Sequence, residues 1–497
     1  MENTNRFKTK IVSREQDYSQ WYLDVSKRWE MYENSPTPGC ITFLPKAVSI
    51  WDWIKNNVSD VLKSKWVQDI YLPLLIPMSF LEKEKDHVEW FAPELAVVTH
   101  AWWKKLQEDL AIRPTSETMF CDFFKKNLNS YRDLPMLYNQ WVNVMRWEKR
   151  TRPFLRTAEF YWQEWHTLHE TEENAYNFAM DIHNNVYIKT IREVLAIEWI
   201  AWEKSESERF AGALNTFTFE WMMSNGWALQ MATSHMLSQW FMKQFDVSFQ
   251  NREWKKDYPF YTSWWLSTRL IWAMISSHWD DNWLIIPPKL SEYNAVLLPI
   301  YTKNNIEEIN DYIEQIWEII TWNKQVVPVK WEFFKSQVWE KWKTLIDNRT
   351  VRLWEKINDF EISWYPIRIE FWDRDIKNNN VVIASRITWE KEVISLEKLK
   401  EKLDSMLINW QNELLKKSKD RLVNNTIVCN SIEEIWEAVK LWKFALYEWD
   451  LNDYFEKEIK EKFSATIRCI PFKWQYTDNL IKLKNEKNKI VIVSRNF

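Results

Sequence analysis

Two arginines and a glutamate near the middle of the chain have the types and spacing of a nucleotide-binding cleft. Arg146 and Glu148 lie two residues apart after a run of strand-forming residues that begins at Trp141, so we expect both side chains to point from one face of a strand. A loop rich in lysine and arginine follows, and we place Arg156 and Phe160 on a second strand. Such a hairpin can direct guanidinium groups toward phosphate, a carboxylate toward an exocyclic amine and a ring toward a base. A hairpin that carries only surface salt bridges is the alternative from spacing alone.

Length, charge and cysteine content limit the class of protein. The 497 residues suffice for roughly three domains. The net charge is −4, so any nucleic-acid binding must come from local patches. The four cysteines are far apart and form no CxxC pair, which is typical of reduced thiols. No apolar run approaches the ~20 residues that cross a bilayer, and the N-terminus lacks an apolar signal core. We therefore expect a cytoplasmic protein with no membrane segment.

Tryptophan and glycine are present in abnormal numbers, 37 and 3 respectively, whereas average usage puts glycine near 7%. Many of the tryptophans stand in polar, turn-like contexts such as HAWWKKL, NREWKKD and SHWDDNW. Turns of this kind favour a residue that tolerates positive φ, not a bulky aromatic. We therefore hypothesise that most of these tryptophans are glycines encoded by UGA. The alternative is a truly tryptophan-rich protein.

Apolar periodicity predicts the elements that position the hairpin. We expect helices over residues 15–35, residues 47–64, Thr115 or Ser116 to about Asn129, residues 170–196, and a stretch that begins near Ser267. We expect strands at residues 41–45, at 70–77 and within 261–266. Prolines within 70–77 suit an edge or an interface. From Glu292 the pattern becomes strand–helix alternation, which predicts an α/β domain with a mostly parallel sheet. A Lys/Glu-rich α/β unit ends the chain.

Several blocks in order, FAPELAVVTH, RPTSE, RWEKRTRPFLRTAEFYWQE, KSESERFAGA, TSWWLSTR, PIRIE and RCIPF, together resemble prolyl-tRNA synthetase of the archaeal/eukaryotic-like class II type. The resemblance implies an α/β chain (α+β catalytic core) in three parts: an antiparallel-sheet class II catalytic domain over 1–290, an α/β anticodon-binding domain over 291–408 and a small C-terminal α/β domain over 409–497. It also implies a homodimer through 70–77. Only 95 residues separate His166 from Thr262, too few for an inserted editing domain.

The resemblance also bears on the tryptophans. Glycine at 66, 90, 102, 103, 165, 202, 265, 272, 279, 283, 364 and 372 would restore the family pattern. Tryptophans that fit the family as they stand are Trp21, Trp51, Trp141, Trp147, Trp162 and Trp264.

The implied reaction joins L-proline to tRNA(Pro) through a prolyl-adenylate made from ATP. Arg146 would hold the α-phosphate and Arg269 the terminal phosphate, and these are the expected catalytic residues. The remaining ATP contacts implied are Glu148 to the adenine amino group, Phe160 stacked on the base, Arg156 beside the triphosphate tail, and Gln230 and Thr233 facing the ribose. Mg²⁺ would bridge the phosphates. For Arg269 alone, a surface ion pair is the alternative.

The resemblance implies a proline pocket and an anticodon contact as well. Thr115 and Glu117 would hold the imino group, with Trp162, Glu164 and His166 around the ring. His166 as a polar residue satisfied by the sheet backbone is the alternative. Glu370, Arg374 and Asp375 would read tRNA bases, although a solvated charge cluster explains the same run.

One departure concerns zinc. Many relatives bind zinc through four cysteines in the C-terminal domain, but only Cys469 matches here, Glu448 replaces one ligand, and no CxxC occurs in the DNLIKLKN region. We expect no zinc and no other protein-bound metal site. Rival functions are another class II synthetase of the threonyl type, a non-catalytic synthetase paralogue, or a tryptophan-rich binding protein.

Overall fold

The computed structural model describes residues 11–82, 94–210, 212–279, 284–301, 306–320, 323–329, 332–338, 343–347, 349, 351–357, 365–386, 388, 390–471 and 487–495. The chain forms two compact units. Unit 1 comprises residues 1–29, 194–196 and 278–416, and unit 2 comprises 30–193, 197–277 and 417–497. Among the residues described, no helix combines the length and apolar character that a membrane span requires.

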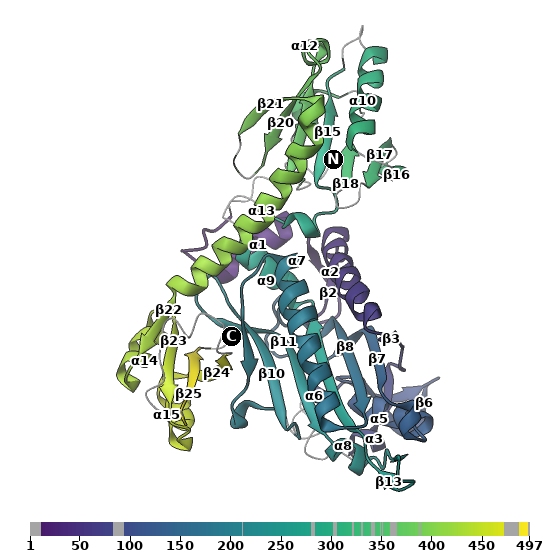
Figure 1. Cartoon of the computed structure of the whole chain (residues 1–497), viewed down its shortest axis with the longest axis vertical. Coiled ribbons are helices and arrows are strands. Elements are labelled where there is room, and N and C mark those ends of the chain that lie inside the picture. The colour runs from purple at the N-terminus through teal and green to yellow at the C-terminus, as the bar shows by residue number, and fades with distance from the viewer. Residues whose placement is uncertain are drawn as a thin grey trace. The chain divides into compact units, whose positions relative to one another are not determined.

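Unit 2 is built on an 11-stranded sheet (Figure 1). Its strands, in spatial order, are β22 (Thr426–Cys429), β23 (Phe444–Trp449), β25 (Lys489–Ser494), β24 (Thr466–Pro471), β9 (Ile200–Glu203), β10 (Asn215–Met222), β11 (Ala228–Ser238), β14 (Phe260–Ser267), β8 (Glu159–His169), β7 (Met136–Met145) and β3 (Gln68–Asp69). All neighbours pair antiparallel except β22 with β23 and β3 with β7. The expected antiparallel core is therefore present, and the C-terminal strands continue it.

The hairpin β7–β8 has the predicted strands, but the functional side chains lie beyond them. β7 ends at Met145, which pairs with Glu159, so Arg146 and Glu148 leave the strand rather than sharing one of its faces. Arg156 lies in a tight turn, where its carbonyl accepts from the Arg152 amide, and not on the second strand. Pro153 cannot donate to a ladder, and Phe154 has φ of 61°, so the chain turns before the ladder can extend.

Helices cover the sheet of unit 2. α2 (Pro45–Ser64), α5 (Glu117–Asn127), α6 (Glu172–Asp181), the π-helix η4 (Ile182–Ile191), α7 (Arg192–Leu195) and α9 (Arg269–His278) match the predicted helices within a few residues. α6 lies across β8 and β11 (Figure 1). Ser116 is the N-cap of α5, as expected, yet its hydroxyl does not cap the helix. That hydroxyl is instead hydrogen-bonded within the site described below.

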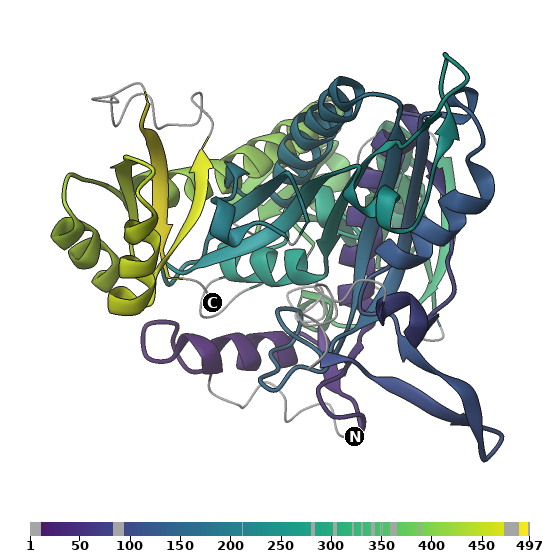
Figure 2. The same ribbon diagram turned by 90° about the horizontal axis from the view of Figure 1, so that it is seen from below.

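A small sheet of β4 (Leu75–Pro77), β6 (Lys104–Ile112) and β5 (Val97–Ala101) carries an arm that projects from unit 2 (Figure 2). The predicted buried strand over 70–77 is wrong, because only residues 75–77 form a strand and Tyr71, Leu74 and Leu75 are exposed. Exposed apolar side chains on this segment leave a hydrophobic patch next to the sheet.

Unit 1 contains α1 (Tyr18–Arg28) and a seven-stranded sheet in the order β16 (Asn323–Val329), β17 (Glu332–Val338), β18 (Lys343–Ile346), β15 (Ala295–Pro299), β19 (Ile367–Phe371), β20 (Asn380–Ser385) and β21 (Lys391–Ser395). Among the strands described, only the pairs β15–β18 and β15–β19 are parallel and the other four pairs are antiparallel, so the expected mostly parallel sheet is wrong. The outer strands join the sheet as antiparallel hairpins, because the short connections between them cannot hold the crossover that a parallel pair needs. α10 (Ile306–Ile320) and the first turns of α13 (Leu396–Asn424) pack on this sheet around Ile313, Leu399 and Leu403.

Among the residues described, five tryptophans adopt positive φ between 52° and 64°. They are Trp66, Trp102, Trp103, Trp254 and Trp442. Three of them are almost fully exposed, with 87% of Trp66, 93% of Trp102 and 100% of Trp103 accessible. Glycine adopts positive φ without the steric cost that a side chain brings, whereas a tryptophan here pays that cost and also exposes its apolar ring to water. None of the tryptophans that fit the family as tryptophan has positive φ.

Candidate active site

A cavity of about 400 Å³ opens over the centre of the unit 2 sheet. Its wall includes eight of the residues singled out from the sequence: Thr115, Glu117, Arg146, Arg156, Trp162, Gln230, Thr233 and Arg269. They come from the start of α5 and the residues just before it, the connection between β7 and β8, β8 itself, β11 and the start of α9. Residues from segments far apart in the sequence therefore meet in one hollow. Glu148, Phe160, Glu164 and His166 lie outside its lining.

Five arginines line this cavity, and three of them, Arg146, Arg156 and Arg269, were singled out from the sequence. Arg146 donates through Nε to the Pro114 carbonyl at 3.1 Å, and Arg269 donates through Nη1 to the Gln230 carbonyl at 3.0 Å. Burial, together with the nearby charges of Arg156 and Arg146, lowers the pKa of Arg269 to about 10. Neighbouring cations in a partly desolvated cavity form a site that favours a polyanion.

Aromatic and acidic groups border the arginines. The Arg146 guanidinium carbon lies 5.7 Å from the centroid of Phe160 and 5.5 Å from that of Trp162. Burial and the neighbouring Glu148 raise the pKa of Glu94, while Arg146 lowers it. Glu94 also contacts the hairpin through its carbonyl, which accepts from the Trp147 amide at 2.8 Å. It belongs to the FAPELAVVTH block, but no role was assigned to it from the sequence.

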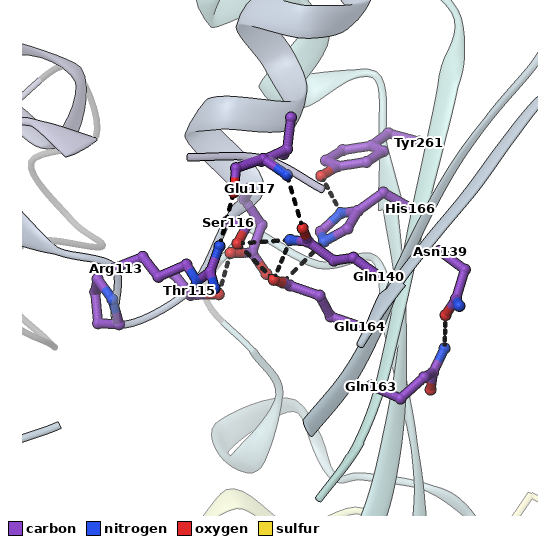
Figure 3. Close-up of polar contacts among 12 residues, drawn as sticks. Arg113, Thr115, Ser116, Glu117, Asn139, Gln140, Gln163, Glu164, His166 and Tyr261 are labelled. Carbon is purple, nitrogen blue, oxygen red and sulfur yellow. Dashed lines mark hydrogen bonds and ion pairs between the residues drawn. The ribbon is translucent and has the colours of Figure 1, made fainter. Parts of the chain in front are cut away.

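A buried polar network lies beside the cavity (Figure 3). The Glu164 carboxylate accepts from Ser116 Oγ at 2.5 Å and from Gln140 Nε2 at 2.6 Å, and its other oxygen lies 3.3 Å from His166 Nε2. His166 Nδ1 is 2.5 Å from the Tyr261 hydroxyl. The histidine is thus held by side chains, and not by the sheet backbone as in the alternative. Glu164 and His166 are each 1% exposed, so they support the wall from behind.

The wall itself carries the groups that can touch a small ligand. The Thr115 hydroxyl donates to the Glu117 carboxylate, and both residues line the cavity. Trp162 packs near Trp265, with ring centroids 6.3 Å apart, and both line the hollow. Trp265 is one of the positions where the family pattern calls for glycine, and its indole occupies cavity space.

Sequence reasoning missed a buried ion network at the other end of the cavity. Glu220 on β10 accepts from Lys204 Nζ at 2.9 Å and from Arg468 Nη2 at 2.8 Å, and Thr218 donates to it at 2.9 Å. Burial alone would raise the pKa of Glu220, but Arg468 and Lys204 hold it at about 2. Lys204 and Arg468 line the cavity. Their segments, KSESERFAGA and RCIPF, were noted, but their pairing was not readable from the sequence.

The side chains expected to read tRNA lie in unit 1. Glu370 on β19 is 4% exposed and pairs with Arg368 at 2.5 Å and Lys391 at 3.1 Å. Asp375 is also buried and accepts from the Trp372 amide at 2.9 Å, which caps α12 (Asp373–Lys377). Arg374 is 78% exposed. Of the three, only Arg374 presents its charge to solvent.

Metal ligands are sparse in the parts of the chain that the structure covers, where no group of three or more His, Cys, Asp or Glu residues is placed to hold an ion. Cys469 is fully buried, and burial raises the pKa of its thiol far above the ordinary value. Glu448 accepts from Asn488 Nδ2 at 2.8 Å. The DNLIKLKN stretch lies outside the described residues.

Comparisons with known proteins agree with this geometry. Residues 99–278 match the model of the tRNA synthetase class II core domain (G, H, P, S and T), and residues 319–406 match that of the anticodon binding domain. The proline–tRNA ligase of Natranaerobius thermophilus is 38% identical over 500 residues, covering 100% of this chain and 99% of the relative. That of Mycoplasma mycoides subsp. mycoides is 40% identical over 465 residues, covering 93% of each. A crystal structure of prolyl-tRNA synthetase from Cryptosporidium parvum, complexed with halofuginone and AMPPNP, superposes with a TM-score of 0.86 at 32% identity, covering 98% of this chain and 99% of that one.

Proposed function

We infer the roles of the site residues from the premise that this chain belongs to the class II prolyl-tRNA synthetases. The protein is a proline–tRNA ligase with a class II catalytic core and an anticodon-binding domain. In the first step, a carboxylate oxygen of proline bonds to the α-phosphorus of ATP and pyrophosphate leaves. In the second, the prolyl carbonyl passes to a hydroxyl of the terminal tRNA ribose and AMP leaves. The carboxylate is already ionised at neutral pH, so the first step needs positioning and charge neutralisation, not a base.

The presence of Arg146, Arg156 and Arg269 in the lining of one cavity is the observation that carries the ATP assignment. We assign Arg146 to the α-phosphate, Arg269 to the terminal phosphate and Arg156 to the tail between them. Charged forks of this kind suit phosphate oxygens, and their mutual repulsion is relieved when a polyanion enters. Phe160 and Glu148 are assigned to the adenine ring and its amino group, and Gln230 with Thr233 to the ribose.

Proline-dependent exchange between ATP and pyrophosphate tests this assignment. We expect Arg269→Met to lower the exchange rate by ~10²–10³-fold, as the loss of one charged contact in a preorganised site does. Arg252→Met is the matched control, because Arg252 is a surface arginine of the same unit, 70% exposed and paired with Glu170 at 2.7 Å. Equal rates for the two variants would contradict the assignment.

We propose that proline lies between Thr115, Glu117 and Trp162. The Glu117 carboxylate provides the anionic acceptor that a secondary ammonium needs, and the indole face covers the ring. Glu164 and His166 act from behind this wall. Glu117→Gln should raise the KM for proline while leaving that for ATP within roughly threefold, since it removes one charge-assisted hydrogen bond. A parallel rise in both constants would refute the placement.

We propose that Mg²⁺ binds together with ATP in this cavity. This ion keeps several waters and is bound by one or two carboxylates plus substrate phosphates. Glu208 lines the cavity and has no role in the proline pocket, so we assign it to the ion. When bound, Mg²⁺ neutralises part of the phosphate charge. We propose no zinc site, since the thiol of Cys469 is sealed and Glu448 is already hydrogen-bonded.

We propose that residues 291–408 read the anticodon and that Arg374 makes the direct contact. Glu370 and Asp375 would fix the strand and helix cap that present it. Arg374→Gln should raise the KM for tRNA and leave proline-dependent exchange unchanged, because the adenylate forms in the catalytic domain. An unchanged KM for tRNA would exclude Arg374. We propose that residues 1–290 form the catalytic domain and that residues 409–497 form the C-terminal domain.

We propose a cytoplasmic homodimer that associates through residues 70–77. Tyr71, Leu74 and Leu75 are exposed apolar side chains of one segment, and Val97 on β5 adds to them. A self-complementary apolar patch suits a twofold interface. Leu74→Glu should shift the sedimentation coefficient to that of a monomer. A wild-type protein that sediments as a monomer at micromolar concentration would end this proposal. All four cysteines are free thiols, as a reducing compartment requires.

We propose that the chain is of the archaeal/eukaryotic-like type and that most tryptophans are glycine in the cell. The 95 residues between His166 and Thr262 leave no room for an inserted editing domain. Positive φ at Trp66, Trp102, Trp103, Trp254 and Trp442 supports the glycine reading. The tryptophans at 90, 283 and 364 lie outside the described residues. Intact mass of the protein isolated from its own cells decides the matter. A mass that matches 37 tryptophans, or UGG codons at 165, 265 and 272, would overturn it.

A further inference from the structure

Gln140 is a fully buried amide that joins the wall of the cavity to a surface segment. It lies on β7 opposite Glu164 on β8 and is 0% exposed. Its Nε2 donates to Glu164 at 2.6 Å and to Ser116 Oγ at 3.0 Å, while its Oε1 accepts from the Leu72 amide at 3.1 Å. Figure 3 shows the amide between Ser116 and Glu164. Every polar atom of the side chain is therefore engaged.

The orientation of this amide follows from its partners. A backbone N–H can only donate, so the Leu72 amide requires the oxygen of Gln140 on its side. The amide nitrogen then faces Ser116 Oγ and the Glu164 carboxylate, which both accept from it. The Leu72 carbonyl is held as well, by Arg113 Nη1 at 2.9 Å, so the anchor is fixed at both polar groups. The main chain at Leu72 thus sets which way the amide points.

We propose that Gln140 is a positioning residue for proline, which holds the pair Ser116–Glu164 in place behind the pocket wall. Ser116 lies between Thr115 and Glu117, the two residues assigned to the imino group, so a shift of its hydroxyl moves both. Glu164 lies two residues from Trp162 on the same face of β8. One amide therefore fixes both sides of the niche. The inference rests on the proline pocket proposed above.

Gln140→Met tests the role, because methionine has a similar length and no hydrogen-bonding amide. We expect the KM for proline in ATP–pyrophosphate exchange to rise ~10–100-fold, the effect of losing a hydrogen bond to a charged group, with the KM for ATP within roughly threefold. Gln163→Met is the matched control: Gln163 is the adjacent glutamine on β8, also 0% exposed, but it bonds Asn139 at 2.6 Å and Tyr187 at 2.9 Å on the other face. Equal effects on both constants, or equal effects of the two variants, would overturn the role.

Gln140→Glu gives a second readout if the methionine variant does not fold. While the introduced carboxyl is protonated it still donates to Glu164, whereas two ionised carboxylates repel. Glu164 is the ionisable group that contacts this position. The other ionisable groups of the same network are His166 on β8, Tyr261 on β14, Glu117 on α5, and Arg113 and Arg146. We expect the KM for proline to rise with pH in Gln140→Glu and not in Gln163→Glu. A flat profile would refute the proposal. Absence of proline-dependent exchange in the unmodified enzyme would instead refute the proposed function.

Discussion

The network of Lys204, Glu220 and Arg468 predicts a measurable coupling between the C-terminal strands and the catalytic sheet. The Glu220 carboxylate has a pKa of about 2 in the folded chain, against an ordinary value of 4.5. At 1.36 kcal/mol per pKa unit, the shift corresponds to about 3 kcal/mol of folding stability at neutral pH, and breaking a buried pair typically costs ~3–5 kcal/mol. The depressed pKa means that this contribution is present above about pH 4.5 and is lost as the pH falls toward 2.

We therefore expect Arg468→Met to lower the free energy of unfolding by ~3–5 kcal/mol, because it leaves a buried carboxylate short of one cation. Thr218→Val serves as control, since it removes one hydrogen bond from a neutral donor to the same carboxylate and should cost ~1.5–3 kcal/mol, less than the loss of a cation. Urea unfolding followed by circular dichroism measures both.

A double-mutant cycle isolates the interaction itself. Arg468→Met and Glu220→Gln should together cost at least ~2 kcal/mol less than the two single effects summed, because the second change removes the charge that the first leaves unpaired. Additivity within ~0.5 kcal/mol would show that the contact carries no energy and would refute the reasoning.

Three further outcomes follow from the structure. Replacing each positive-φ tryptophan by glycine should raise the free energy of unfolding by ~0.5–1 kcal/mol per site, because the steric cost of a left-handed backbone exceeds the entropy that glycine loses on folding. Trp21→Gly, at a buried tryptophan, should lower it. Thermal melts in which the replacements at positive φ also destabilise the protein would contradict this. Burial holds the pKa of His183 at about 3, so the folding stability that depends on its neutral form falls as the pH drops below about 6.5. His183→Phe should therefore reduce the dependence of the unfolding free energy on pH between pH 6.5 and about 4. An unchanged dependence would exclude His183 as its source. Lys356 donates to the carbonyls of Pro299 and Asp347 at 2.9 Å each, so Lys356→Met should destabilise unit 1 by ~1.5–3 kcal/mol. Proline-dependent ATP–pyrophosphate exchange should persist, because the class II core domain lies in unit 2. Loss of this exchange would contradict the prediction.

The sequence predicted the elements near the site better than the positions of their side chains. The two strands of the hairpin and the helix that follows Ser116 are present close to the expected ranges. Alternation could not show that β7 stops at Met145, because the stop depends on how the turn at Arg152 closes. For the same reason, Arg146 reaches the cavity from a loop rather than from a strand.

Contacts between distant segments account for what the sequence could not supply. Glu220 and Arg468 are 248 residues apart, and no local pattern marks them as partners. Gln140 precedes the run of strand-forming residues that begins at Trp141, and only the approach of Leu72 gives its amide a direction. The parallel reading of the unit 1 sheet failed because strand–helix alternation describes β15 and its neighbours but not the hairpins outside them.

The pairing of β24 with β9 also has a consequence for biosynthesis. Ile470 and Pro471 are the residues that pair with Glu203 and Trp202, so β9 has no partner on that side until translation has passed residue 471. At ~5–20 residues per second, the ribosome takes roughly 10–50 s to cover the interval. Throughout that time the nascent chain presents an open strand edge, the kind of surface on which two unfinished polypeptides can pair. The edge of β9 in unit 2 is thus covered only by one of the final described segments to emerge.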